Sequence, residues 1–289
     1  SMTTATLWDD RACKLGEGPL WHPERKQLFW FDILGQKLLT RTDSGPIEWH
    51  FDEIVSAAGW VDDSTLLIAS ETALFTFDLN SAESEFIAPL EADTPATRSN
   101  DGRADPWGGF WIGTMSKTAE TGAGAIYRYY RGELRKLHPG ITIPNAICFS
   151  PDGRFAYFAD TLTRKIMRQP LSGSDGWPTG NAEVWLDLTA DGLLPDGAVT
   201  DAAGNLWNAQ WGASRVAQYG PDGTFLRAVS VPAAHSSCPA FGGPDLTTLF
   251  CTTAQELLSA EDLAANPAHV QTFAATDQGP GLPEPRVIL

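Results

Sequence analysis

The chain has 289 residues, a formal charge of −16 at pH 7, and abundant glycine, proline and tryptophan at 27, 20 and 11 residues. Such an acidic surface repels phosphate backbones and anionic headgroups, so we expect no nucleic-acid or membrane partner and favour a neutral or cationic ligand. The many turn-forming and aromatic residues favour short strands over helices.

A turn followed by a short strand recurs six times along the chain. The copies are WHPERKQLFWFD from Trp21, WVDDSTLLIAS from Trp60, DGRADPWGGFWIGTM from Asp101, FSPDGRFAYFAD from Phe149, VTDAAGNLWNAQW from Val199 and AFGGPDLTTLFCTT from Ala240. Their strands are centred, 38 to 50 residues apart, on Phe29, Leu67, Trp111, Tyr157, Trp207 and Phe250. A period of this size with hairpin turns inside each unit is typical of propeller blades with four strands apiece.

Other elements fit the same architecture. Third strands are expected at 37–41, 74–78, 126–130, 165–169 and 216–219. Because an open ring would leave strand edges exposed, we expect 5–8 and 270–274 to share one blade. One short helix is predicted at 257–266, with Ser259 as the N-cap of its later part.

These elements predict an all-β fold, a six-bladed β-propeller with four-stranded blades closed by pairing of the N- and C-terminal strands. It would form a single domain over residues 1–289, and a monomer is expected for a closed ring. A β-sandwich with a second domain would explain the strands but not their regular interval. The cysteines show no CxxC spacing, and there is no signal segment or membrane-length apolar run, so a reduced, cytoplasmic protein is expected.

A polar residue lies eleven or twelve positions before the central residue of four of these strands, at Glu17, Asn100, Asn145 and Asp196. The first strand of each blade lines the channel of a propeller, so these positions surround one mouth. Each could be an ordinary turn residue beside Pro or Gly, but a shared offset in four repeats favours a site. Converging oxygen ligands, two of them anionic, predict a hard divalent-cation site. At the equivalent position in the sixth repeat, Cys238 is expected to be a small buried apolar residue.

Four segments carry a family resemblance: GEGPLW, RSNDGRADPWGGFWIGTM, PNAICFSPDGR and PDGAVTDAAGNLW. Over nearly the whole chain the sequence resembles the senescence-marker-protein, gluconolactonase and luciferin-regenerating-enzyme-like family. The resemblance implies a sugar lactonase on a six-bladed propeller, with one divalent metal held by Glu17, Asn145 and Asp196. Ala146 stands where many relatives carry glycine, and we expect only a local backbone change from it.

The resemblance also implies substrate contacts from Arg98, Asn100 and Glu120, the last in the shortened segment 116–124. A metal with three protein ligands leaves positions open for water and for the lactone carbonyl. We therefore predict that metal-bound water attacks the polarised carbonyl, with Asp196 as general base. The donor set admits Ca²⁺, Mg²⁺, Mn²⁺, Fe²⁺ and Zn²⁺. Xylono-, arabinono-, galactono- and gluconolactone are the leading substrates, with a pentonolactone preferred.

Two alternatives stay open. One is an aryl-esterase or phosphotriesterase-type enzyme on a similar propeller, and the other is a non-enzymatic divalent-metal-binding protein. No GxSxG elbow or HExxH helix occurs, so no covalent nucleophile or zinc-protease helix is expected. His22 is expected to be structural, and Trp211 is expected to pack within its blade rather than line the site.

Overall fold

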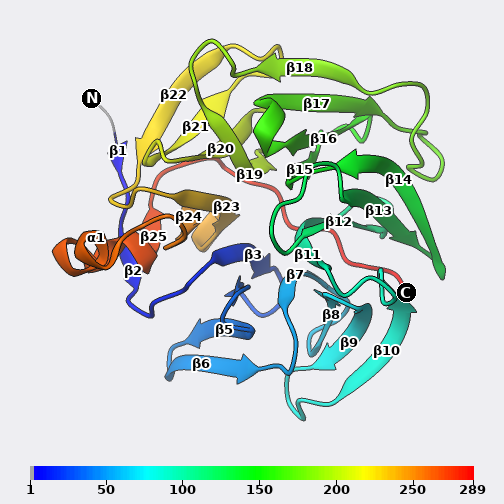
Figure 1. Ribbon diagram of the computed structural model, residues 1–289, viewed down its shortest axis with the longest axis horizontal. Coiled ribbons are helices and arrows are strands. Elements are labelled where there is room, and N and C mark those ends of the chain that lie inside the picture. The colour runs from blue at the N-terminus through cyan, green and yellow to red at the C-terminus, as the bar shows by residue number, and fades with distance from the viewer. Residues whose placement is uncertain (1–2) are drawn as a thin grey trace.

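The computed structural model describes residues 3–289, and almost all of its regular structure is β-strand. Six sheets are arranged around a ring, as Figure 1 shows. Five of these sheets have four strands and one has five. The predicted six-bladed β-propeller is confirmed.

The first three blades follow one another directly along the chain. Blade I consists of β3 (Gly16–His22), β4 (Gln27–Asp32), β5 (Lys37–Thr42) and β6 (Gly45–His50). Blade II consists of β7 (Val55–Trp60), β8 (Thr65–Ser70), β9 (Ala73–Asp78) and β10 (Ser84–Pro89). Blade III consists of β11 (Thr97–Ala104), β12 (Phe110–Ser116), β13 (Gly124–Tyr130) and β14 (Glu133–Ile141).

The other three blades complete the ring. Blade IV consists of β15 (Pro144–Phe149), β16 (Phe155–Asp160), β17 (Lys165–Pro170) and β18 (Glu183–Asp187). Blade V consists of β19 (Leu194–Thr200), β20 (Leu206–Trp211), β21 (Arg215–Tyr219) and β22 (Phe225–Ser230). Blade VI consists of β23 (Ser236–Gly242), β24 (Thr248–Thr253), β25 (Thr272–Ala275) and β2 (Thr6–Asp9). The first strands of successive blades contact one another, so they form the inner wall of the ring.

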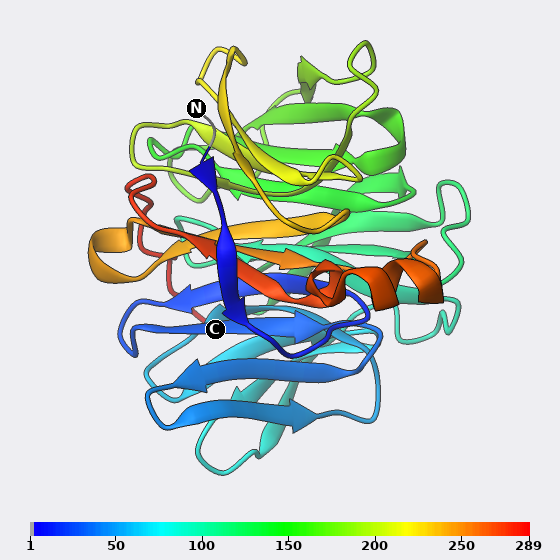
Figure 2. The same cartoon turned by 90° about the vertical axis from the view of Figure 1, so that its left-hand side faces the viewer.

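The ring is closed by the N-terminal segment, as expected. Strand β2 pairs antiparallel with β25, with Leu7 opposite Phe273, and β1 (Thr3–Thr4) pairs with β22 of blade V. Figure 2 shows this segment in dark blue along the outside of the ring. The predicted ranges were offset from these strands by one or two residues. One N-terminal segment therefore ties two blades together.

The C-terminal tail makes a second closure that the strand pattern did not predict. After β25 it crosses the ring, drawn in red in Figure 1, and reaches blades V, III and II. Its backbone donates from Val287 to Trp60 O at 2.8 Å and from Ile288 to Gly108 O at 2.9 Å. The Glu284 carboxylate forms an ion pair with the buried Arg103. The tail thus seals the end of the inner wall at which β11 ends.

The predicted helix is present but shorter. Helix α1 covers Ala260–Ala265, and Ser259 caps it in a capping box with Asp262. It begins only after Leu257, because that residue has a φ of 66°, outside the right-handed helical region. Three short 3₁₀ turns accompany it: η1 (Thr161–Thr163), η2 (Pro244–Leu246) and η3 (Pro267–Val270). Within residues 3–289, no helix has the length and apolar character needed to cross a membrane.

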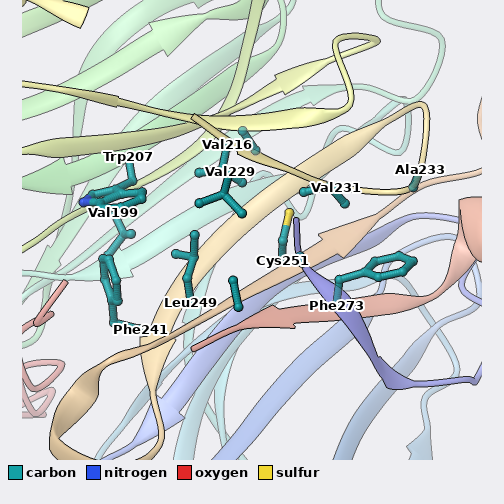
Figure 3. Close-up of a cluster of buried hydrophobic side chains, with 13 residues drawn as sticks. Val199, Trp207, Val216, Val229, Val231, Ala233, Phe241, Leu249, Cys251 and Phe273 are labelled. Atoms are coloured by element: carbon teal, nitrogen blue, oxygen red, sulfur yellow. The ribbon is translucent and has the colours of Figure 1, made fainter. Parts of the chain in front are cut away.

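Apolar layers between neighbouring blades hold the ring together. Figure 3 shows the layer between blades V and VI, where Trp207, Val216 and Val229 face Phe241, Leu249 and Phe273. Tryptophans are fully buried in three blades, at Trp30, Trp111 and Trp207. Because protein interiors are close-packed, these layers fix the position of each inner strand relative to its neighbours.

Candidate metal and substrate site

The inner strands carry their polar residues at β-bulges. The pairing with the second strand shifts register at or beside the four residues that share the sequence offset, Glu17, Asn100, Asn145 and Asp196. A bulge inserts an extra residue into one strand and re-aims the side chains beside it. Strands β7 and β23 have a shift at the same level. The repeat therefore produces a ring of bulges that turns polar side chains toward the centre.

These four side chains meet at one cavity. It has a volume of about 500 Å³, and Glu17, Arg98, Asn100, Asn145 and Asp196 all line it. All five are buried. The rest of the lining comes from Leu15, Met115, Lys117, Thr118, Ala119, Ile143, Thr161, Leu162, Leu194, Trp211, Glu256 and Leu257. The cavity thus has a buried polar floor, and the exposed residues of its lining are both polar and apolar.

The side-chain amide of Asn145 lies next to the carboxylate of Asp196. Its Nδ2 donates to Thr161 Oγ1 at 2.7 Å, and that hydroxyl donates to the carbonyl of Pro195 at 2.7 Å. In this orientation Asn145 Oδ1 faces Asp196 Oδ1 at 3.0 Å; with the amide rotated by 180°, the nitrogen donates to that oxygen instead. Two acceptors this close need a proton or a cation between them. The orientation with facing oxygens is the one that suits a bound cation.

Burial also dominates the electrostatics of the two carboxylates. It raises the pKa of Glu17 well above its usual 4.5, and the nearby charge of Asp196 raises it further. It raises the pKa of Asp196 to about 7. In the part of the chain that the structure describes, neither carboxylate forms an ion pair with lysine or arginine. Buried carboxylates without such a partner must bind a proton or a cation, and two carboxylates with an amide oxygen fit a divalent cation.

Sequence reasoning missed a third buried carboxylate, that of Asp101. Its Oδ2 accepts from the backbone N–H of Ile147 at 2.9 Å, and burial raises its pKa to about 6. Oxygen or sulfur atoms of Glu17, Asp101 and Cys238 all lie within 4.8 Å of one another. Adjacent residues of a regular strand face opposite sides, so a regular strand with Asn100 directed inward would direct Asp101 outward. The bulge in β11 turns both residues inward.

Cys238 lies at the level of the site as a packing residue. It is buried, and burial raises the pKa of its thiol well above the usual 9.0, so the thiol stays protonated. Its side chain occupies the space that a Cβ on Gly197 would need. This agrees with the small apolar role expected for it.

Asn208 in β20 holds the bulge that carries Asp196. Its Nδ2 donates to the carbonyl of Asp196 at 2.9 Å and to that of Gly197 at 3.1 Å, while its fully buried Oδ1 has no partner in the described residues. The equivalent residues of the other five blades are apolar: Trp30, Ile68, Ile112, Phe158 and Cys251. The single amide in this series occurs where a candidate ligand needs its backbone supported.

The backbone after Asn145 keeps the shape that glycine would favour. Ala146 has a φ of 58° and is fully buried. Such a left-handed conformation is uncommon for residues with a Cβ, and glycine adopts it readily. Replacement of glycine by alanine therefore leaves the candidate ligand on the same local turn.

Arg98 has hydrogen-bonding capacity directed at the cavity. Its Nη1 donates to the carbonyl of Ser99 and to Asn100 Oδ1, both at 3.0 Å. Its Nε and Nη2 have no hydrogen-bond partner in residues 3–289. Burial lowers the pKa of Arg98, and the charges of nearby carboxylates oppose this shift. Arginine stays protonated under these conditions, so the free N–H groups can bind an oxygen of a ligand.

Two residues differ from expectation. Glu120 is exposed in the turn between β12 and β13 and is not among the residues that line the cavity. The acid at the cavity mouth is Glu256, in the loop between β24 and α1, and no repeat position indicated it.

The prediction that Trp211 does not line the site was wrong, because this residue lines the cavity. Its ring also stacks on that of His235, with the ring centroids 4.3 Å apart. His22 is structural as expected, with its buried ring hydrogen-bonded to Asp62 O.

The fold and the site together define a six-bladed β-propeller with a buried oxygen-donor site built from its inner strands. The family model described as the SMP-30/Gluconolactonase/LRE-like region matches residues 15–255. The chain belongs to this family, as its sequence segments indicated.

Relatives match over nearly their whole length. A putative sugar lactone lactonase of Rhizobium meliloti (strain 1021) is 42% identical, covering 91% of this chain and 90% of the relative. An L-arabinolactonase of Azospirillum brasilense is 37% identical, covering 96% and 93%. The crystal structure of a calcium-binding protein, regucalcin, from Agrobacterium tumefaciens strain C58 superposes with a TM-score of 0.96 at 41% identity, covering 100% and 98%.

Proposed function

We propose that this protein hydrolyses a sugar-derived lactone to the open-chain aldonic acid, using a divalent cation held by Glu17, Asn145 and Asp196. The observation that carries the proposal is the convergence of these three side chains, from blades I, IV and V, beneath a cavity lined by Arg98 and Asn100. The lactonases among the relatives support a lactone-hydrolysing enzyme. The calcium-binding relative supports a divalent cation.

Hydrolysis requires a polarised carbonyl, an activated water and a proton acceptor. A bound divalent cation supplies Lewis acidity toward the carbonyl oxygen and lowers the pKa of water. Asp196 takes the proton as the water oxygen bonds to the carbonyl carbon, and the proton then goes to the ring oxygen as the ring C–O bond breaks. No covalent intermediate is needed.

Arg98 and Asn100 act on the substrate side. The free N–H groups of Arg98 bind a hydroxyl or the charge that develops on the carbonyl oxygen. Asn100 accepts from Arg98 Nη1 at 3.0 Å and donates to the Pro144 carbonyl at 2.8 Å, so it fixes the guanidinium against blade IV. We propose a pentonolactone as the preferred substrate, which the A. brasilense relative supports.

The decisive experiment follows ring opening by proton release, with chelated protein and with protein reloaded with Ca²⁺, Mg²⁺, Mn²⁺, Fe²⁺ or Zn²⁺. Xylono-, arabinono-, galactono- and gluconolactone are compared with aryl esters and an organophosphate. Metal-restored opening of an aldonolactone supports the proposal. Preference for aryl esters would instead establish the esterase alternative, and tight metal binding without faster ring opening would establish a metal-binding protein.

Variants separate the roles within the site. Glu17→Ala and Asp196→Ala are expected to lose both metal retention and activity. Arg98→Ala is expected to retain the metal and to lose turnover or substrate affinity. Activity of Asp196→Ala equal to that of the parent would remove the mechanism.

A further inference from the structure

The loop between β24 and α1, residues 254–259, lies at the mouth of the cavity and is held at both ends. Ala254 N donates to His235 O at 3.1 Å, and Gln255 N donates to Lys14 O at 3.0 Å. At the other end, Ser259 and Asp262 form the reciprocal hydrogen bonds of the capping box, each at 3.0 Å. Figure 2 shows α1, in orange, at one end of the ring. Both anchors fix the position of the two residues at the tip of the loop.

Glu256 is the first of these tip residues, and it lines the same cavity as Arg98. After burial, which lowers the pKa of Arg98, the largest influence on that pKa is the charge of Glu256, ahead of Glu17 and Asp196. In residues 3–289 the Glu256 carboxylate forms no ion pair. A carboxylate accepts and a guanidinium donates, so a hydroxyl between them is recognised through both its hydrogen and its oxygen.

Leu257 is the second tip residue, and both its backbone conformation and its exposure to solvent are unfavourable. It has a φ of 66°, in the left-handed region that residues with a Cβ rarely adopt. The residue is 89% exposed, although its side chain is apolar. Backbone outliers of this kind concentrate at ligand-binding positions. Leu257 also lines the cavity mouth, so a bound ring would cover its apolar surface.

We propose that residues 254–259 form a substrate-selecting wall of the site. In this arrangement Glu256 and Arg98 together bind one hydroxyl of a polyhydroxylated lactone, and Leu257 packs on a C–H face of its ring. The inference rests on the proposed lactone hydrolysis. It assigns to blade VI the acidic contact that the family resemblance implied for Glu120.

The test compares the preferred aldonolactone with a set of analogues that each lack one hydroxyl. Glu256→Gln is expected to lower kcat/KM for the hydroxylated lactone by about tenfold, because a hydrogen bond to a charged acceptor is weakened. It should leave kcat/KM unchanged for the analogue that lacks the hydroxyl bound by Glu256. The affinity for the divalent cation should also stay unchanged. The matched control is Glu261→Gln, which removes the same charge from the first turn of α1 without touching the cavity.

A second variant separates binding from folding. Leu257→Gly removes the apolar contact and suits the φ of 66°, so KM should rise severalfold without a fall in Tm. The inference is overturned if the parent opens aldonolactones and Glu256→Gln discriminates among the analogues as the parent does. A parent that opens no lactone under any metal would overturn the proposed function and this inference together.

Discussion

The buried carboxylate of Asp196 makes the stability of the cation-free protein depend on pH. Its pKa is raised by burial to about 7, compared with 3.8 for an ordinary aspartate. Well below its ordinary pKa of 3.8 the carboxyl is protonated in both the folded and the unfolded protein, so it contributes nothing to the pH dependence of stability there. As pH rises from 4 to 7 the unfolded chain loses this proton first, so the folded state becomes progressively less stable.

The size of the effect follows from the difference between the two pKa values. At about 1.4 kcal/mol per pKa unit, ionisation of Asp196 removes roughly 4 kcal/mol of stability between pH 4 and 7. The loss from Asp196 alone is at most this large, because Asp196 and Glu17 interact and burial together with Asp196 also raises the pKa of Glu17. A bound cation favours the ionised form and should therefore offset this loss.

The assay is urea unfolding of chelated protein at several pH values between 4 and 8, for the parent and for Asp196→Asn. The variant cannot ionise at this position, so its free energy of unfolding should fall less as pH rises. Addition of a divalent cation should raise the stability of the parent at pH 7 and hardly affect that of the variant. Parallel pH profiles for the two chelated proteins would refute the electrostatic reasoning.

Three further predictions concern residues around the site. Glu284→Ala leaves Arg103 buried without its partner and should cost about 3–5 kcal/mol in urea unfolding; an unchanged midpoint would mean that the tail does not seal the ring. Asn208→Leu should weaken cation binding about tenfold by calorimetry, as loss of a supporting hydrogen bond does elsewhere, and equal affinity would contradict its role at the bulge. Gly18→Ala overlaps the backbone oxygen of Ser56 at a φ of 58°. The substitution should lower the free energy of unfolding by about 3 kcal/mol and weaken cation binding. A native-like melting curve with full cation binding would show that the bulge can relax.

The repeat period was enough to predict the ring, because each blade is a local unit whose turns and apolar strands are close in sequence. The central residues Phe29, Trp111 and Trp207 all lie in second strands, as expected. Closure by the N-terminal segment was also predictable, since an open ring would expose strand edges. The crossing of the C-terminal tail was not, because its backbone hydrogen bonds, its ion pair and the burial of Val287 are single contacts with distant blades, which leave no periodic signal.

The offset within the repeat located the buried part of the site for a similar reason. Every inner strand has its bulge at the same level, so Glu17, Asn145 and Asp196 could be compared across repeats. Asp101 escaped that comparison, since a bulge changes which side a residue faces and alternation along a strand no longer applies. Asn208 lies in a second strand, outside that offset, and only its difference from five apolar counterparts distinguishes it in the sequence.

The mouth of the cavity depends on loops of different blades, and their positions follow from packing between distant parts of the chain. Glu256 and Arg98 line the same cavity although they belong to blades VI and III, and neither sequence distance nor repeat position encodes that arrangement. Glu120, by contrast, lies in an exposed turn of blade III and does not line the cavity. Periodic patterns are local and specify the blades and their inner residues. Contacts between blades are non-local, and they determine which side chains line the mouth of the cavity.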